Sequence, residues 1–86
     1  MNVFKAMEST MLLAHQEARS PDRLSLFHFR HESLGYVHLC EMHVRAQNET
    51  MKDDKLHRWL AWMQASIVSW AGTSTVEDMK RINKES

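Results

Sequence analysis

Four histidines near the middle of the chain form its densest set of side chains that could do chemistry: His28, His31, His38 and His43. The nearby potential ligands are Glu32, Cys40 and Glu41. Imidazole together with a thiolate or a carboxylate is a ligand set that zinc and iron accept. On one helix, His31 and His38 would lie two turns apart on the same face. One functional interpretation is therefore a histidine-rich, metal-binding helical protein.

The spacing of these residues favours packing over a closed metal site. The pairs His28-x-x-His31 and Cys40-x-x-His43 are separated by a spacer far shorter than zinc fingers use. On a helix, moreover, Cys40 and His43 would point some way from His31. Hydrogen-bonded or partly buried histidines account for the same pattern. We therefore expect no metal or other cofactor, and the four histidines are the candidate ligands if a metal binds.

Cys40 is the sole cysteine, so an internal disulfide is excluded, which is typical of the reducing cytoplasm. A catalytic thiolate needs an oriented base and a partly exposed, electropositive pocket. His38 and His43, as neighbours on a helix, supply neither. The sequence also contains no phosphate-cradling glycine loop, paired-carboxylate signature or serine nucleophile motif. We expect a protein that is not an enzyme.

Three apolar side chains are candidates for binding a partner: Leu12, Leu13 and Trp62. Trp62 falls at the edge of an apolar helical stripe, about 60° from Trp59. The two leucines likewise lie off the apolar stripe of the first helix. Exposed aromatic residues dominate interface hot spots. The competing interpretation is that another helix covers these side chains.

The run over residues 68–76 resembles the turn of helix-turn-helix repressors, in which an Ala-Gly-apolar-Ser turn precedes the recognition helix; here the matching run is Val-Ser-Trp-Ala-Gly-Thr-Ser-Thr-Val. The resemblance covers only these residues and implies a DNA-binding transcriptional regulator. Glu77 and Asp78 would then face phosphates, and like charges oppose docking there. DNA binding is therefore the alternative function, and nucleic acid is a disfavoured partner.

The composition indicates one small soluble domain over residues 1–86. A chain this short buries only about 60% of its unfolded surface, so a protein partner or a homodimer is expected. Eleven basic residues balance eleven acidic ones, which gives no field to attract nucleic acid or an anionic membrane. No secretory signal follows Met1, and no apolar run approaches the roughly 20 residues of a membrane span. We expect a cytoplasmic location and no membrane contact.

The periodicity and the caps predict helices. A helix over residues 2–19 has the apolar stripe Phe4, Met7, Met11, Ala14 and Ala18. A second has the larger stripe Leu56, Trp59, Leu60, Met63, Ile67 and Trp70, and a short last helix has Val76, Met79 and Ile82. The expected helix starts are Ser20-Pro21-Asp22, a capping box over residues 50–53, and another over residues 74–77 directly after the helix-ending Gly72.

The segment over residues 21–48 allows two interpretations. As one long central helix it has one apolar face with Leu24, Phe27, Leu34 and Met42, and an opposite one with Leu26, Phe29, Val37, Cys40 and Val44. As a β-hairpin over residues 24–45, turning at residues 32–35, it aligns Phe27, Phe29, Val37 and Leu39 on one face. The helix is preferred because an isolated two-stranded ribbon is marginally stable. Gly35 could divide that helix in two.

The sequence thus predicts an all-α bundle of four helices, or five if Gly35 divides the middle segment, with short loops. The predicted function is a small protein-interaction module that regulates or inhibits a larger macromolecule by binding to its surface. Compact phage and plasmid genomes often encode accessory proteins of this kind. A helix-turn-helix regulator and a metal-binding protein are the two alternatives.

Overall fold

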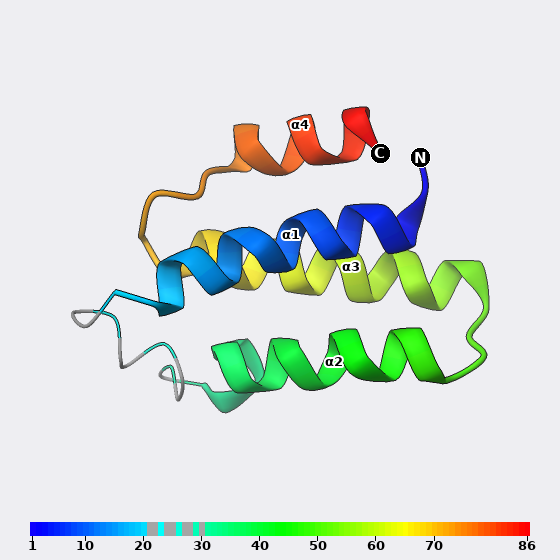
Figure 1. Ribbon diagram of the computed structural model, residues 1–86, viewed down its shortest axis with the longest axis horizontal. Coiled ribbons are helices and arrows are strands. Elements are labelled where there is room, and N and C mark those ends of the chain that lie inside the picture. The colour runs from blue at the N-terminus through cyan, green and yellow to red at the C-terminus, as the bar shows by residue number, and fades with distance from the viewer. Residues whose placement is uncertain (21–22, 24–25, 27–28, 30) are drawn as a thin grey trace.

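The computed structural model describes residues 1–20, 23, 26, 29 and 31–86 (Figure 1). Its α-helices are α1 (Val3–Ala18), α2 (Tyr36–Asn48), α3 (Asp53–Ser69) and α4 (Val76–Glu85). A short 3₁₀ helix, η2 (Glu32–Leu34), precedes α2. The described residues contain no strand. The predicted all-α bundle is confirmed, and the alternative β-hairpin over residues 24–45 is wrong.

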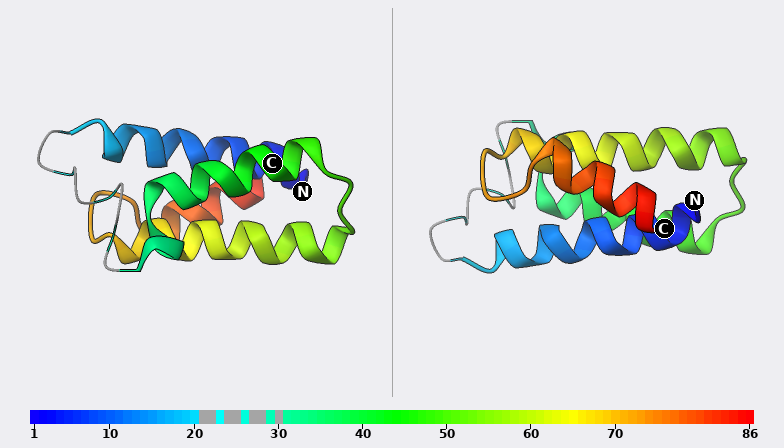
Figure 2. Two further views of the ribbon diagram at one scale, coloured as in Figure 1. Left: turned by 90° about the horizontal axis from the view of Figure 1, so that it is seen from below. Right: turned by 90° about the horizontal axis from the view of Figure 1, so that it is seen from above.

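The helices form three layers. α1 and α3 run side by side in the same direction, and α2 and α4 run in the opposite direction (Figure 1). α2 covers the α1–α3 pair on one side and α4 covers it on the other, as the views from below and from above show (Figure 2). The two chain ends lie side by side and are joined by a hydrogen bond from the Asn2 N–H to the Ser86 carbonyl, at 2.8 Å. Among the helices described, none combines the length and the apolar composition needed to cross a bilayer.

α1 contacts each of the other three helices. Its start is capped by Asn2, whose Oδ1 accepts from the Lys5 N–H at 3.1 Å. The predicted stripe is confirmed at Met7, Met11, Ala14 and Ala18, all of which are buried. It is wrong at Phe4, which is 47% exposed. The covered face extends instead towards Val3, Ala6, Thr10 and Glu17, away from Phe4.

A buried chain of polar side chains joins three helices. Thr10 of α1 donates its hydroxyl to the Ala6 carbonyl at 2.7 Å and accepts from Gln64 Nε2 of α3 at 3.2 Å. Gln64 also exchanges two hydrogen bonds with the Asn83 amide of α4, at 2.8 and 3.3 Å. A connected buried network of this kind fixes how the helices align along their axes.

α3 carries the large apolar stripe that the sequence predicts. Its buried members are Leu56, Leu60, Met63, Ile67 and the capping Trp70, and Trp59 is half-buried. The predicted capping box over residues 50–53 is wrong, because α3 begins at Asp53 and its N-cap, Lys52, makes no side-chain cap bond. Asp53 and Asp54 lie in the first turn instead, where the helix dipole favours negative charge.

The middle segment does not form the predicted long helix. α2 begins only at Tyr36, and the preceding Gly35 is extended, with φ −83° and ψ 165°. The prediction of two apolar faces is also wrong, because α2 lies on one side of the α1–α3 pair and buries a single face. That face consists of Leu39, Met42 and Ala46, while Val37 and Val44 are exposed. Leu26 joins the core; the predicted contributions of Leu24 and Phe27, and the Ser20-Pro21-Asp22 start, involve residues outside those described.

The connection from α3 to α4 differs from the sequence prediction by one residue at each end. Ala71, rather than Gly72, takes the left-handed conformation after α3, with φ 56°. The capping box is formed by Thr75 and Asp78, not by Ser74 and Glu77. Ser74 is buried instead. Met79 and Ile82 are buried as predicted, whereas Val76 is exposed.

The capping box gives a test of this register. We expect Thr75→Ala to lower the free energy of unfolding by about 1 kcal/mol, because the Asp78 N–H loses its acceptor. Thr75→Ser keeps a hydroxyl at that position and is the matched control. Urea unfolding followed by circular dichroism measures the difference. Equal midpoints for Thr75→Ala and Thr75→Ser would contradict the described start of α4.

Candidate functional site

The structure does not bring the described candidate metal ligands together. His31 is exposed before η2, and His38 lines the side of α2 that faces α3. His43 is half-buried near Glu8 of α1. It lies five residues after His38 on α2, so the two side chains point about 140° apart around the helix axis. His28 lies outside the described residues. Within the described part of the chain, no group of three or more His, Cys, Asp or Glu side chains is placed to hold a metal ion.

Cys40 lies half-buried on α2 and is hydrogen-bonded to Tyr36. Burial raises the pKa of its thiol, the Tyr36 hydrogen bond lowers it, and the charge of Glu41 raises it, so the net shift is upward. Burial and Cys40 together raise the pKa of Tyr36 to about 12. The Tyr36 hydroxyl also meets Nδ1 of His15 on α1. This cluster therefore joins α1 to α2, and burial keeps the Cys40 thiol protonated at neutral pH.

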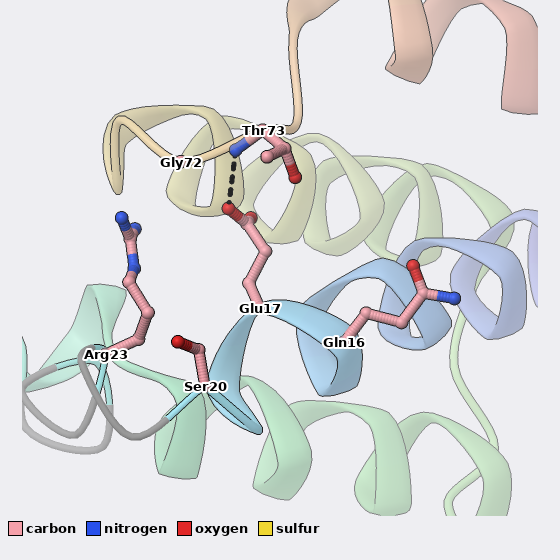
Figure 3. Close-up of a pocket in the computed structure, with 6 residues that line it drawn as sticks. All are labelled: Gln16, Glu17, Ser20, Arg23, Gly72 and Thr73. Carbon is pink, nitrogen blue, oxygen red and sulfur yellow. Dashed lines mark hydrogen bonds between the residues drawn. The ribbon is translucent and has the colours of Figure 1, made fainter.

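A polar hollow of about 230 Å³ lies where the end of α1 meets the α3–α4 turn (Figure 3). Glu17 is only 8% exposed, and its Oε1 accepts from the Thr73 N–H at 2.9 Å. Arg23 Nη2 donates to the Trp70 carbonyl at 2.8 Å. Two side chains that are distant in sequence from this turn therefore bind its backbone.

The Glu17 carboxylate occupies the space that a side chain at residue 72 would enter. A Cβ built on Gly72 would lie 1.6 Å from Oε1 of Glu17, and φ is not positive there. Oε2 of Glu17 is buried without a hydrogen-bond partner among the described groups. Leaving a buried polar atom unpaired costs free energy. The hydrogen bond from the Thr73 N–H to Oε1 holds the carboxylate against the turn despite this cost. We call the contact of the Glu17 carboxylate with Gly72 and Thr73 the latch.

Leu12 and Leu13 line a groove of about 370 Å³ between α1 and α4, which we call the α1–α4 groove. Leu12 is 56% exposed, whereas Leu13 is half-buried and packs against the core. Charged side chains surround the leucines, among them Lys5, Arg81 and Glu85. Of the two predicted partner-binding leucines, Leu12 is therefore the exposed one.

Trp62 lines a separate groove of about 350 Å³ between α2 and α3, the α2–α3 groove. Its lining consists of His38, Met42, Arg45, Arg58, Trp59 and Trp62. Trp62 is 44% exposed although it lies in this groove. Because α2 and α4 cover opposite sides of the α1–α3 pair (Figure 2), the three predicted partner-binding residues do not form one surface.

The two indole rings of the α2–α3 groove are held in place by their neighbours. Trp62 Nε1 donates to the Ser33 carbonyl of η2 at 2.9 Å. The Trp59 ring lies beneath two cations: the Arg45 guanidinium is 5.1 Å from its centroid and the Lys55 ammonium 5.3 Å. These contacts fix the positions of both rings in the groove.

The charged side chains of the α2–α3 groove are arginines, and only one of the two is paired with a carboxylate among the described residues. Arg45 donates to Glu49 at 2.8 Å, and this hydrogen bond holds the pKa of Glu49 below its usual value. Arg58 is exposed and takes part in no ion pair among the described residues. No carboxylate in the described part of the chain belongs to the lining. The groove thus combines apolar rings with cationic side chains.

Sequence reasoning identified Trp62 but missed the rest of this groove. The available signal was the spacing of Lys55, Arg58, Trp59 and Trp62, which share one side of a helix at intervals of three and four residues. Arg45 and His38 belong to a different helix, so only the packing of α2 on α1 and α3 places them opposite.

Comparison of the chain with known protein families, with curated proteins and with solved structures found no match. The function must therefore be argued from the described side chains.

Three substitutions in the latch separate the space available at residue 72 from the hydrogen bond that Glu17 accepts. We expect Gly72→Ala to lower the free energy of unfolding, because its Cβ would overlap Oε1 of Glu17. Glu17→Gln keeps an acceptor for the Thr73 N–H and should be tolerated, whereas Glu17→Ala should cost about 1–3 kcal/mol by leaving that N–H unpaired. Urea midpoints of the three variants measure the effects. A neutral Gly72→Ala together with a neutral Glu17→Ala would contradict the latch.

His43 gives a test of pH dependence. Burial lowers its pKa below the ordinary 6.5, Glu8 raises it and His15 lowers it. The unfolded chain therefore binds the proton at a higher pH than the folded protein does. The resulting stability is present above about pH 6.5 and is lost as the pH falls towards the folded pKa. As the pH is lowered from about 7.5 to 5.5, the urea midpoint should fall less for His43→Gln than for the unmodified protein. An equal fall in both proteins would contradict the assignment of this pH dependence to His43.

Proposed function

We propose that this protein is a non-enzymatic binding module that regulates or inhibits a larger macromolecule by occupying part of its surface. The observation that best supports this is the exposed Trp62 ring in the α2–α3 groove. Tryptophan and arginine are the residues most enriched among interface hot spots, and this groove holds two of each. We further propose that it is a cytoplasmic accessory protein of the kind that phages and plasmids encode.

The fixed positions of the rings support binding without a large rearrangement. Trp62 is already bonded to Ser33, and Trp59 lies under Arg45 and Lys55. A partner that meets ordered side chains loses less conformational entropy on binding than one that must order them. The groove is therefore suited to a partner that approaches from solution as a preformed surface or segment.

The helix-turn-helix alternative has less support. In that interpretation α4 is the recognition helix, and its first turn contains Glu77 and Asp78. Hydrogen bonds from Thr75 hold the pKa of Asp78 below its usual value, so this carboxylate remains ionised at neutral pH. Two negative charges at that position would repel the phosphates that supply most DNA affinity.

We also propose that the chain forms a homodimer through the α1–α4 groove. The exposed Leu12 is its central contact, and this surface lies away from Trp62. A dimer of this kind would compensate for the small core of a short chain while leaving the α2–α3 groove free.

A capture experiment tests both proposals. The unmodified protein, Trp62→Ala and Leu12→Glu are immobilised in turn, and a lysate of the source organism is passed over each. We expect a specific protein to be retained by the unmodified protein and lost with Trp62→Ala. Sedimentation at micromolar concentration should give a dimer that Leu12→Glu shifts towards monomer. Circular dichroism checks that both variants remain helical.

Val76→Ala is the matched control, because Val76 is 53% exposed and lines neither groove. Capture that survives Trp62→Ala would reject the α2–α3 groove as the binding surface. Retention of one particular DNA sequence by the unmodified protein would favour the alternative function, a helix-turn-helix transcriptional regulator. A monomer at every concentration would reject the homodimer alone.

A further inference from the structure

We propose that the α2–α3 groove binds an acidic peptide segment of another protein, with an apolar side chain of that segment seated on Trp62 and a carboxylate bonded to Arg58. This inference rests on the proposed binding function and adds the chemical class of the partner.

The floor of the groove supplies the apolar contact. Met42 is almost fully buried, Trp59 is half-buried and Trp62 is 44% exposed, so together they form a graded apolar surface between the two helices. The Trp62 N–H is already donated to Ser33. A partner therefore meets the face and edge of the ring and gains from apolar contact.

The walls of the groove supply the charge complement. Arg45 and Arg58 lie on opposite walls, one on α2 and one on α3, and His38 adds an imidazole. In the described part of the chain, Arg58 has no ion pair and no carboxylate lines the groove. An arginine can bind a carboxylate through two parallel hydrogen bonds. A segment with a carboxylate near an apolar residue would match Arg58 beside Trp62.

The distribution of charge favours a peptide over a nucleic acid. The chain carries eleven basic and eleven acidic residues, so the cations of the groove are a local exception. Nucleic-acid affinity depends on neutralising several phosphates along a track. Here Glu49 already occupies Arg45, and Asp54 lies one helical turn before Arg58. One arginine without an ion pair among the described residues, set beside apolar rings, suits a short acidic segment better than a polyanion.

Calorimetric titration with two synthetic peptides tests the inference. One peptide carries Glu and Leu at helical spacing, and the other replaces every Glu with Lys. We expect the Glu–Leu peptide to bind and to weaken by at least about tenfold with Arg58→Glu and with Trp62→Ala. Trp62→Phe keeps a ring and should retain most of the binding. Arg58→Glu should in turn bind the Lys–Leu peptide better than the unmodified protein does.

Lys84→Glu is the control for net charge, since Lys84 is exposed on α4, which does not contribute to the groove. Equal weakening by Lys84→Glu and Arg58→Glu would overturn the inference, as would equal binding of the two peptides. Tighter binding of a thymidine oligonucleotide than of the Glu–Leu peptide would assign the groove to nucleic acid instead. Loss of peptide binding with Leu12→Glu alone would move the site to the α1–α4 groove.

The capture experiment distinguishes this failure from failure of the proposed function. A protein captured in a Trp62-dependent manner, combined with no binding of the Glu–Leu peptide, would leave the binding function in place and overturn the acidic segment. Capture of no specific protein by the unmodified chain would reject the binding function, and with it the physiological meaning of any peptide binding.

Discussion

Three helices pack against α1, and they come close because its buried face is built from small and flexible side chains. Ala6 and Ala14 are fully buried and bring nothing larger than a methyl group to the contact. Met7 and Met11 fill the irregular space between the neighbours, as unbranched side chains do well. Thr10 adds the polar bond that aligns α3 and, through Gln64, α4. With α1 and α3 paired in the middle, α2 and α4 have only the two opposite sides to occupy.

The grooves follow from this arrangement. α2 packs mainly on α1 and meets α3 less closely, so the space between α2 and α3 is taken up by long side chains rather than by helix backbone. Two tryptophans of α3 serve the fold at the same time, since Trp62 and Trp70 donate to the carbonyls of Ser33 and Leu34 and thereby hold η2. The side chain that we assign to partner binding is therefore also part of the scaffold, which limits its motion.

Local charge matters more here than total charge. The chain is neutral as a whole, which provides no long-range attraction to polyanions. The α2–α3 groove nevertheless collects cations around aromatic rings, whereas the start of α4 collects carboxylates for its cap. A neutral protein with such patches can select a partner by complementary contacts at short range, where salt screens charge less when the pair is partly buried.

The sequence by itself determined the helical class and most of the core. The stripes of α1 and α3 recur at intervals of three and four residues, and that period depends only on helix geometry. Local signals were less exact at helix ends: Thr75 and Asp78 replaced the predicted Ser74 and Glu77, because two overlapping residues could each act as the cap. Gly35, which the sequence offered as a possible break, is the residue after which α2 starts. Tertiary structure alone decided that α2 buries one face, that Gly72 accommodates Glu17, and that Arg45 faces Arg58 across a groove. These depend on contacts between residues distant in the chain, and periodicity within one segment carries no information about which neighbour will cover it.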